Sequence, residues 1–486
     1  MTTSETDTVD SDIVYDSSIL RTSVDSVMAT GVAVLLLFTL FRGVLLEPNT
    51  CIHQGKEFLI VMPKIIPPSA SRTYHLIIQG PPTATVTVIS PWNDTFKETI
   101  GKDSQITFHA HDIRINANFV ENPVQKVAFR VSCPVQVNVY VYSDGADGYT
   151  ALHMPYSRLS QDVSQRYVIA SYKAGNGCKA YIALAAIKEH TLVNGTVRVQ
   201  NGGKAFIGSQ PLDDGQSFTN IQLGALDVMY IWSYQDLTGS GILADKYISV
   251  FSGFDCTCQP GGGDRLCHGI ITQMPPVPRL KRENLPVPVL GYSDDTIFRV
   301  IAIKTNTRFR IPPNSTFHTT LVKIGDYAEI HSASLSPGII SGEKEILVMS
   351  YVEVNEAGSG FLSLMTLVRP GLQFKEAFRV YAIPSFDSSI LILHPLSPSN
   401  TYSIIINDTT LISFDTFDVG LNYVVLRTEI EAGYHLITSA NKSARISVFV
   451  YGRGDGASYS FTGACVRRKE EGKIYRNDYN LDLTYG

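Results

Sequence analysis

Apolar residues along this chain fall into short runs that alternate with polar residues and recur in four similar sets. Such alternation is typical of half-buried β-strands. Each set ends in an apolar run that predicts a buried strand, at 139–142, 248–251, 346–349 and 446–449. A phenylalanine, a turn glycine and another apolar run come earlier, within 96–108, 218–231, 317–330 and 414–426. Hairpin candidates open the sets, at 74–78 with 85–88, 181–186 with 196–199, 298–303 with 307–311, and 389–393 with 402–406.

The four sets are spaced by about 100 residues, which indicates a duplicated module. A unit of ~100 residues with six or seven short strands suits a β-sandwich, whereas a propeller blade needs only ~40–50 residues. We therefore predict an all-β fold, a tandem array of four related antiparallel β-sandwich-like modules. A propeller-like arrangement of the same units is the alternative.

The repeats predict the organisation of the whole chain. Residues 1–50 hold a polar stretch and one hydrophobic segment, and residues 256–289 are the longest irregular region, rich in Cys, Gly and Pro. The predicted modules are 51–145, 146–255, 290–374 and 375–463, followed by a polar tail at 464–486.

The hydrophobic segment at 27–41 bears on the compartment of the protein. At about 15 residues it is short for a membrane span and fits the core of a signal peptide better. The residues before it are polar and acidic, unlike a basic signal-peptide start, but a chain beginning at Met28 would read as a compact export signal. A cleaved signal and an uncleaved anchor both remain open, with Met1 or Met28 as the start. Both place the rest of the chain outside the cell, and only the anchor attaches it to a membrane.

Composition agrees with a β-rich, exported protein. The chain has 24 Tyr and 22 Phe but 2 Trp, and its formal net charge is −5 with a pI near 6.1. Aromatic residues favour strands, and the lack of a long basic run argues against a nucleic-acid partner.

Seven cysteines are present, an odd number that leaves at least one unpaired or intermolecular. Scattered cysteines in an exported chain favour disulfides. Cys256 with Cys267 would close a short glycine-rich loop, and Cys51 with Cys465 would tie the ends of the repeat array. The other candidates are Cys133 and Cys178. The Cys256–His268 spacing fits zinc poorly, so we predict neither a metal site nor a cofactor.

Two further sets of residues are candidate surface sites. N-glycosylation sequons begin at Asn93, Asn194, Asn314, Asn407 and Asn441. Arg453-Gly454-Asp455 is a tripeptide that many adhesion ligands use to engage integrins.

The sequence contains no local catalytic motif. It has no G-x-S-x-G elbow, phosphate-binding loop or H-E-x-x-H pair. We therefore predict a protein that is not an enzyme. An active site whose residues are far apart in sequence would show no local motif, so a secreted hydrolase with a dispersed active site, acting on extracellular polymers, is the alternative.

One stretch of the second module resembles a known family. It includes Asp236-Leu237-Thr238-Gly239-Ser240 and residues 245–253, and continues through Cys256, Cys267-His268 and Gln273 to Pro275-Pro276-Val277. Together with Met154-Pro155 and the run at 167–172, these residues resemble the amino-terminal domain of the IgG Fc-binding protein family. Two departures are the extra Cys258 and the lack of an acidic residue between the second loop cysteine and His268.

The resemblance implies a secreted or surface protein with a β-rich, disulfide-stabilised binding region and no enzymatic activity. We accordingly expect an extracellular binding or adhesion protein, with a role in mucosal or surface defence. Its expected partner is an extracellular glycoprotein, a mucus component or a microbial surface.

The loop from Cys256 to Cys267 yields a testable prediction. Its three glycines make the open loop costly to order, and the chain-entropy contribution of a disulfide there is ~3 kcal/mol. Non-reducing peptide mapping should recover Cys256 and Cys267 in one linked fragment. Recovery of both as free thiols would contradict it.

Overall fold

The computed structural model divides the chain into two units, Met1–Thr50 and Cys51–Gly486. The first unit, with the hydrophobic segment at 27–41, lies outside the described residues. Those are 54–62, 73–101, 105–110, 120–144, 150–153, 165–173, 177–258, 267–287, 296–311, 317–332, 338–356, 359–368, 375–396, 402–411, 414–418, 423–441, 444–454 and 457–466. Among these residues, no helix has the length and apolar character needed to span a membrane.

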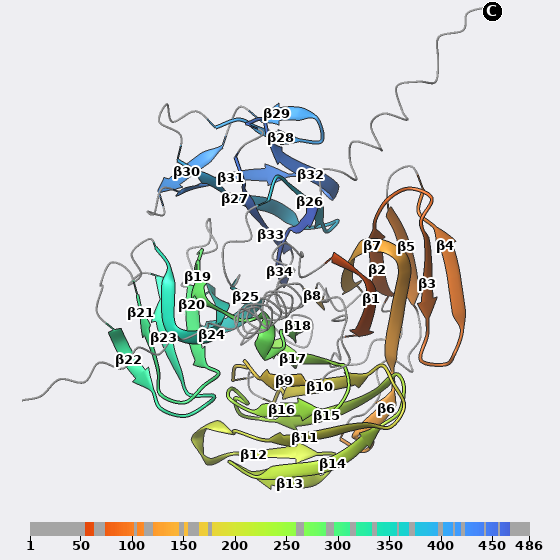
Figure 1. The fold of residues 1–486 in the computed structure, drawn as a ribbon, viewed down its shortest axis with the longest axis vertical. Helices are drawn as coiled ribbons and strands as arrows, with labels where there is room; N and C mark the ends of the chain where they lie inside the picture. Colours follow the sequence, from red (N-terminus) through yellow and green to blue (C-terminus); the bar gives the residue numbers. More distant parts are fainter. Residues whose placement is uncertain are drawn as a thin grey trace, which may run out of the picture. The chain divides into compact units, whose positions relative to one another are not determined.

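The described residues form antiparallel sheets and no α-helix, which confirms the all-β prediction. Four groups of sheets follow one another along the chain, and we call them blades 1 to 4 (Figure 1).

Blade 1 is one sheet in the order β4-β3-β7-β2-β5, with β1 and β8 also on β7. The long strand β7 joins most of its members. The strands are β1 Gln54–Val61, β2 Thr73–Gln79, β3 Thr85–Ile89, β4 Thr95–Thr99, β5 Gln105–Ala110, β7 Ala128–Asp144 and β8 Thr150–His153.

Blade 2 has two sheets, β13-β12-β15-β10-β17-β18 with β6 on β15, and β14-β11-β16-β9. The first contains β6 Val124–Lys126, β10 Ala180–Ala186, β12 Lys204–Ile207, β13 Gln210–Asp213, β15 Asp227–Ser233, β17 Ile248–Cys258 and β18 Cys267–Met274. The second contains β9 Gln165–Val168, β11 Thr191–Thr196, β14 Ser217–Leu223 and β16 Gly241–Ala244, with the short 3-10 turns η2 Gln200–Gly202 and η4 Val277–Arg279 nearby in the chain.

Blade 3 repeats the plan of blade 1, in the order β22-β21-β24-β20-β23 with β19 and β25 on β24. Its strands are β19 Lys281–Asn284, β20 Thr296–Ala302, β21 Thr307–Arg310, β22 Phe317–Leu321, β23 Tyr327–His331, β24 Ile340–Glu356 and β25 Ser359–Leu367. The region 256–289, expected to be irregular, thus contains β18, η4 and β19, because its apolar residues Ile270, Ile271 and Met274 are buried.

Blade 4 again has two sheets, β29-β28-β32-β26-β35 and β30-β31-β27-β33-β34. The first contains β26 Ala377–Ala382, β28 Ile404–Ile406, β29 Thr409–Leu411, β32 Gly433–Ser439 and β35 Ala464–Val466. The second contains β27 Asp387–Pro395, β30 Asp415–Asp418, β31 Tyr423–Ile430, β33 Ser447–Gly454 and β34 Ala457–Thr462.

The predicted hairpins are wrong in their pairing, although their strands exist except at 196–199, where only Thr196 belongs to a strand. β10 pairs with β15 and β17 rather than with β11, and β20 pairs with β23 and β24 rather than with β21. In the same way, β2 pairs with β5 and β7 rather than with β3, and β27 pairs with β31 and β33 rather than with β28. Every residue of β10 and of β20 is buried, so these strands need neighbours on both edges and cover on both faces.

Four apolar clusters join the blades in a propeller-like ring, as the alternative arrangement predicts. One cluster joins blades 1 and 2, and others join blades 2 and 3, and blades 3 and 4. A further cluster packs Ile77, Tyr140 and Tyr142 of blade 1 against Phe378 and Val380 of blade 4, which closes the ring.

One strand from each blade lies at the centre of the ring. β8, β18, β25 and β34 each pair with the preceding long strand of their own blade. They also contact one another around the ring, β8 with β18, β18 with β25, β25 with β34, and β34 with β8. Figure 1 shows their labels gathered between the four blades.

The junction of blades 2 and 3 contains a backbone contact that yields a prediction. Gly239 has φ +92°, and a Cβ there would lie 2.6 Å from the carbonyl oxygen of Gly325. Gly177 has φ +80° but no neighbour within 4 Å of its Cβ position. Gly177→Ala should therefore cost only backbone strain, roughly 1–2 kcal/mol, while Gly239→Ala adds a steric term of about 1–3 kcal/mol. Urea unfolding of both variants measures the difference, and equal losses would refute the contact.

Candidate functional site at the junction of blades 2 and 3

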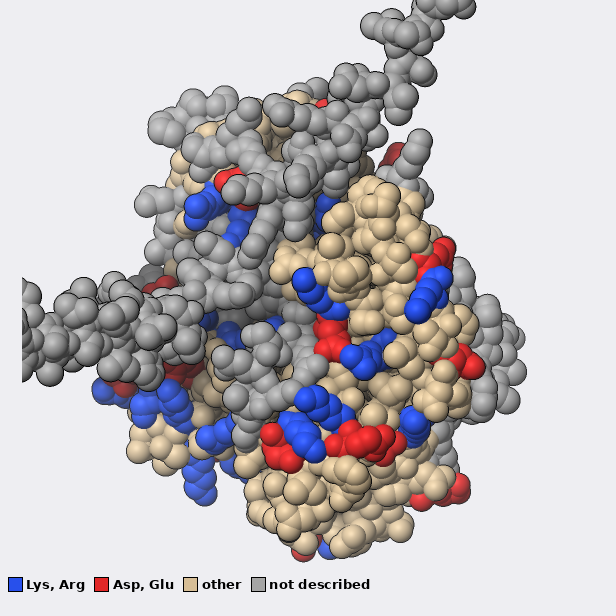
Figure 2. Space-filling model, turned by 45° about the vertical axis from the view of Figure 1, so that its right-hand side comes forward, with Lys and Arg blue, Asp and Glu red and all other residues tan. Residues whose placement is uncertain are grey.

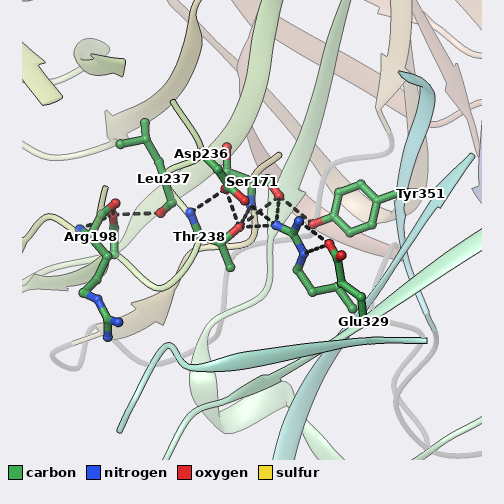
Figure 3. Close-up of polar contacts among 9 residues, drawn as sticks. Ser171, Arg198, Asp236, Leu237, Thr238, Glu329 and Tyr351 are labelled. Carbon is green, nitrogen blue, oxygen red and sulfur yellow. Dashed lines mark hydrogen bonds and ion pairs between the residues drawn. The ribbon is translucent and has the colours of Figure 1, made fainter. Parts of the chain in front are cut away.

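The family-like stretch at 236–240 forms the turn between β15 and β16. Thr238 N donates to Asp236 Oδ1 at 2.8 Å, and the Ser240 hydroxyl donates to the Leu237 carbonyl at 2.9 Å. Ser240 Oγ in turn accepts from Arg198 N at 2.9 Å. An acidic or hydroxyl side chain that binds backbone two or three residues away closes a turn without help from a sheet. The motif therefore stabilises its own loop (Figure 3).

The same turn binds a buried arginine from the next blade. Arg299 of β20 is 3% exposed, and its Nη1 donates to Asp236 Oδ2 at 2.7 Å and to the Ser171 carbonyl at 2.8 Å. Its Nη2 and Nε donate to Glu329 Oε1 at 2.5 and 3.1 Å. Figure 3 shows Asp236, Ser171 and Glu329 converging from the two blades.

Three tyrosines surround the Arg299 guanidinium. The rings of Tyr327, Tyr172 and Tyr351 lie 4.2, 4.7 and 5.1 Å from its central carbon. The Tyr351 hydroxyl also donates to the Ser171 carbonyl at 2.9 Å, and burial raises the pKa of Tyr351, so its phenol stays neutral. Burial lowers the pKa of Arg299, but the interactions with Tyr351, Asp236, Tyr327 and Glu329 outweigh it and raise the pKa above its usual range.

All three nitrogens of the Arg299 guanidinium are engaged within the chain, and the residue is almost fully buried, so the network is internal to the protein. Its chemistry is that of a joint: two carboxylates, a carbonyl and three ring faces hold one cation between two blades. The family-like motif thus places blade 2 against blade 3.

An open pocket of about 480 Å³ lies at the same junction. It is formed by the chain that leaves blade 2 through η4 and continues into β19, and by the turn after β20 together with β24. Val277, Leu280 and Ile303 give it an apolar part, of which Leu280 and Ile303 are buried. The remaining lining residues are Pro278, Lys281, Arg282, Lys304 and Glu345.

The charged residues of the pocket are three cations and one carboxylate. Lys304 Nζ lies 2.7 Å from Glu345 Oε2, and Arg282 Nε lies 3.9 Å from Glu345 Oε1. The hydrogen bond from Lys304 is the main cause that lowers the pKa of Glu345, which therefore stays ionised. The pocket keeps an excess of positive charge, while the face in Figure 2 shows Lys and Arg beside Asp and Glu.

The structure describes the side chains of two of the predicted disulfide candidates, Cys133 and Cys178. Cys133, a disulfide candidate, is a free thiol, 5% exposed in the core of blade 1, and burial raises its pKa. That candidate is therefore corrected: its side chain points into the apolar cluster with Val131 and Val137. Cys178 is disulfide-bonded. Cys51 and the side chains of Cys256, Cys267 and Cys465 lie outside the described residues, so their pairing stays a prediction.

The remaining surface candidates, the N-glycosylation sequons and the Arg453-Gly454-Asp455 tripeptide, differ in their exposure and in how much of them is described. Asn93, Asn407 and Asn441 are exposed, Asn194 is half-buried with its Oδ1 accepting from Asn220 N at 2.8 Å, and Asn314 lies outside the described residues. Arg453 and Gly454 end β33, and Gly454 pairs with Ala457 of β34, while Asp455 is not described. Glycosylation and adhesion at these residues stay predictions.

Sequence reasoning missed both Arg299 and the pocket. Arg299 lies in an otherwise apolar strand, and that interruption was the available signal for a buried, paired charge. The pocket gathers residues from 277 to 345 that share no motif.

The fold and the junction define a class: an all-β ring with a buried inter-blade joint and a basic pocket. No group of three or more potential metal ligands occurs among the described residues. The sequence profile of the IgGFc binding protein family matches residues 149–452. The chain belongs to the IgGFc binding protein family, as the resemblance predicted.

Two solved structures are distantly similar to the chain. No curated protein matches the chain. An anti-sigma factor domain-containing protein from Clostridium clariflavum is 10% identical over 66% of this chain and 96% of its own, with a TM-score of 0.12. A structure described as a Ca²⁺-stabilised adhesin that helps an Antarctic bacterium bind ice is 9% identical over 85% and 99%, with a TM-score of 0.11.

Replacement of Arg299 tests the joint. Arg299→Met leaves the carboxylate of Asp236, whose side chain is 7% exposed, buried without a cation. The expected loss in the free energy of unfolding is about 3–5 kcal/mol, measured by urea denaturation. Arg308→Met removes an arginine whose side chain is 50% exposed and paired with Glu343, and should change stability little. Similar losses in the two variants would contradict the role of Arg299.

Proposed function

We propose that this chain is an extracellular, non-enzymatic recognition protein that binds acidic glycans of glycoproteins, such as those of mucus or of microbial surfaces. Membership of a family of extracellular binding proteins supports the general class. The basic pocket between blades 2 and 3 is the observation that carries the partner chemistry.

The pocket suits a ligand that combines an acid group with apolar ring faces. Lys281, Arg282 and Lys304 outnumber Glu345, and Glu345 is already engaged by Lys304 and Arg282. Carboxylates and sulfates of glycans are fixed anions that lysine and arginine bind through charge-assisted hydrogen bonds. The apolar side chains of Val277 and Leu280 can cover the C–H face or an acetyl methyl of a sugar ring.

The surrounding structure supports recognition by a rigid surface. The pocket lies at the junction whose two blades are also joined by the buried hydrogen bonds of Arg299. A preformed pocket loses less conformational entropy on binding than a flexible loop does. Defence at a mucosal or other surface is the role that we infer for such binding.

Neutralisation of Lys304 tests the pocket. Lys304→Gln should raise the Kd for sialylated or sulfated mucin about tenfold, which corresponds to about 1.4 kcal/mol. Lys204→Gln is a matched control, because Lys204 is 55% exposed and paired with Asp213, while Lys304 is 54% exposed and paired with Glu345. Biolayer interferometry at two salt concentrations measures both, and the wild-type affinity should fall with salt.

Two outcomes would overturn the proposal. The first is equal mucin affinity for the two variants, or affinity that survives removal of sialic acid and sulfate. The second is turnover of glycan, ester or peptide substrates by the wild type, lost on one carboxylate or serine substitution, which would establish a hydrolase instead.

A further inference from the structure

The junction of blades 4 and 1 contains a second buried arginine, and this one lacks an acid. Arg379 of β26 is 3% exposed, like Arg299. Its Nε donates to the Tyr434 hydroxyl at 3.1 Å, but its Nη1 is buried without a hydrogen-bond partner. No carboxylate of a described residue forms an ion pair with it. A buried cation with one neutral partner is costly, because burial removes its hydration without replacing it by an opposite charge.

The blade 1 side of this junction also contains unsatisfied polar groups, beside its apolar residues. The Tyr140 hydroxyl of β7 donates to the Arg379 carbonyl at 3.2 Å, which joins the two strands across the ring closure. Asn138 lies two residues before Tyr140, on the same face of β7, and is fully buried. Both its side-chain amide nitrogen and its side-chain oxygen lack partners.

The unsatisfied amides continue across the sheet. Gln79 of β2 and Gln54 of β1 both pair in register with Asn138, so their side chains share its face. Gln79 is fully buried with both side-chain polar atoms unpartnered, and Gln54 is 5% exposed with its Nε2 unpartnered. Buried polar groups are normally hydrogen-bonded, so three open carboxamides in one row indicate that the row has a partner of its own.

We propose that the junction of blades 4 and 1 binds a small inorganic anion against Arg379 Nη1, with the carboxamides of Asn138 and Gln79 as further donors. An anion supplies the charge that Arg379 lacks and accepts the open N–H groups. Water would satisfy the amides but would leave the arginine uncompensated. Arg299, at the junction of blades 2 and 3, obtains the same compensation from Asp236 and Glu329.

Anion binding at this position would strengthen ring closure. A ligand that binds only the folded protein stabilises it in proportion to ln(1 + [L]/Kd). The site lies between parts of the chain that are far apart in sequence, so an anion there links the first blade to the last. This role is separate from glycan recognition at the junction of blades 2 and 3.

Thermal unfolding of the full chain tests the proposal. Chloride, sulfate and phosphate are each titrated into gluconate buffer at constant ionic strength. We expect at least one of them to raise the Tm of the wild type along a saturating curve. Arg379→Met should abolish that rise, and in gluconate alone it should be no less stable than the wild type, since it removes an unpaired buried charge. Arg308→Met should respond like the wild type.

Several results would overturn the proposal. A wild-type Tm that does not depend on which anion is present would do so without any variant. An identical anion response in Arg379→Met would do so as well. If Arg379→Met does not fold, Asn138→Leu replaces it: a shifted anion midpoint with retained folding supports the site, and an unchanged midpoint refutes it.

Discussion

The closing contact between blade 1 and blade 4 is the constraint on which the rest of the ring depends. Each blade has an apolar surface that only the next blade covers, and blade 4 must find its cover on the blade farthest away in sequence. Tyr140 of blade 1 makes such a contact. Its side chain is fully buried, and its ring centroid lies 6.0 Å from that of Tyr381 and 5.1 Å from that of Phe461, both in blade 4. Without that contact two apolar surfaces would face water, at roughly 25 cal/mol for each Å². The ring is therefore stabilised as a whole rather than blade by blade.

The junctions satisfy this constraint with different chemistry. Blades 1 and 2 meet through apolar residues, including Leu59, Val61 and Phe251. Blades 2 and 3 add the Arg299 network, whose directed hydrogen bonds admit one relative placement of the two blades. Apolar contact alone is non-directional, so a buried, fully paired charge contributes register where packing contributes free energy. The junction of blades 4 and 1 contains a buried charge, Arg379, that no carboxylate of a described residue compensates.

The sequence predicted the elements of the fold better than their connections. The alternating runs identified the all-β class and the long strands β7, β17, β24 and β33, because period two and burial are local properties. Pairing is not local: every residue of β10 is buried, yet its partners β15 and β17 lie about 50 and 70 residues further along the chain. β6 lies within the first predicted module but pairs in the sheet of blade 2, and its few exposed residues gave no sign of this.

The same distinction explains what could be found of the candidate sites. The turn at 236–240 was recognisable because its residues are consecutive and belong to a family pattern. Its partner Arg299 comes from another blade, and the pocket draws on η4, β19, the turn after β20 and β24, so both needed the three-dimensional structure. The resemblance thus marked a turn that lies at the junction of blades 2 and 3, although the side chains of that turn are buried.

The residues of the turn and those of the pocket differ in how freely they can be replaced. Asp236, Thr238 and Gly239 are held by buried contacts, so a change in any of them disturbs the placement of two blades. Lys281 and Lys304 are exposed at the pocket and make no buried contact, so their replacement alters charge without disturbing the joint. The turn at 236–240 therefore maintains the shape of the junction, and under the proposed function ligand preference can change through the side chains that line the pocket.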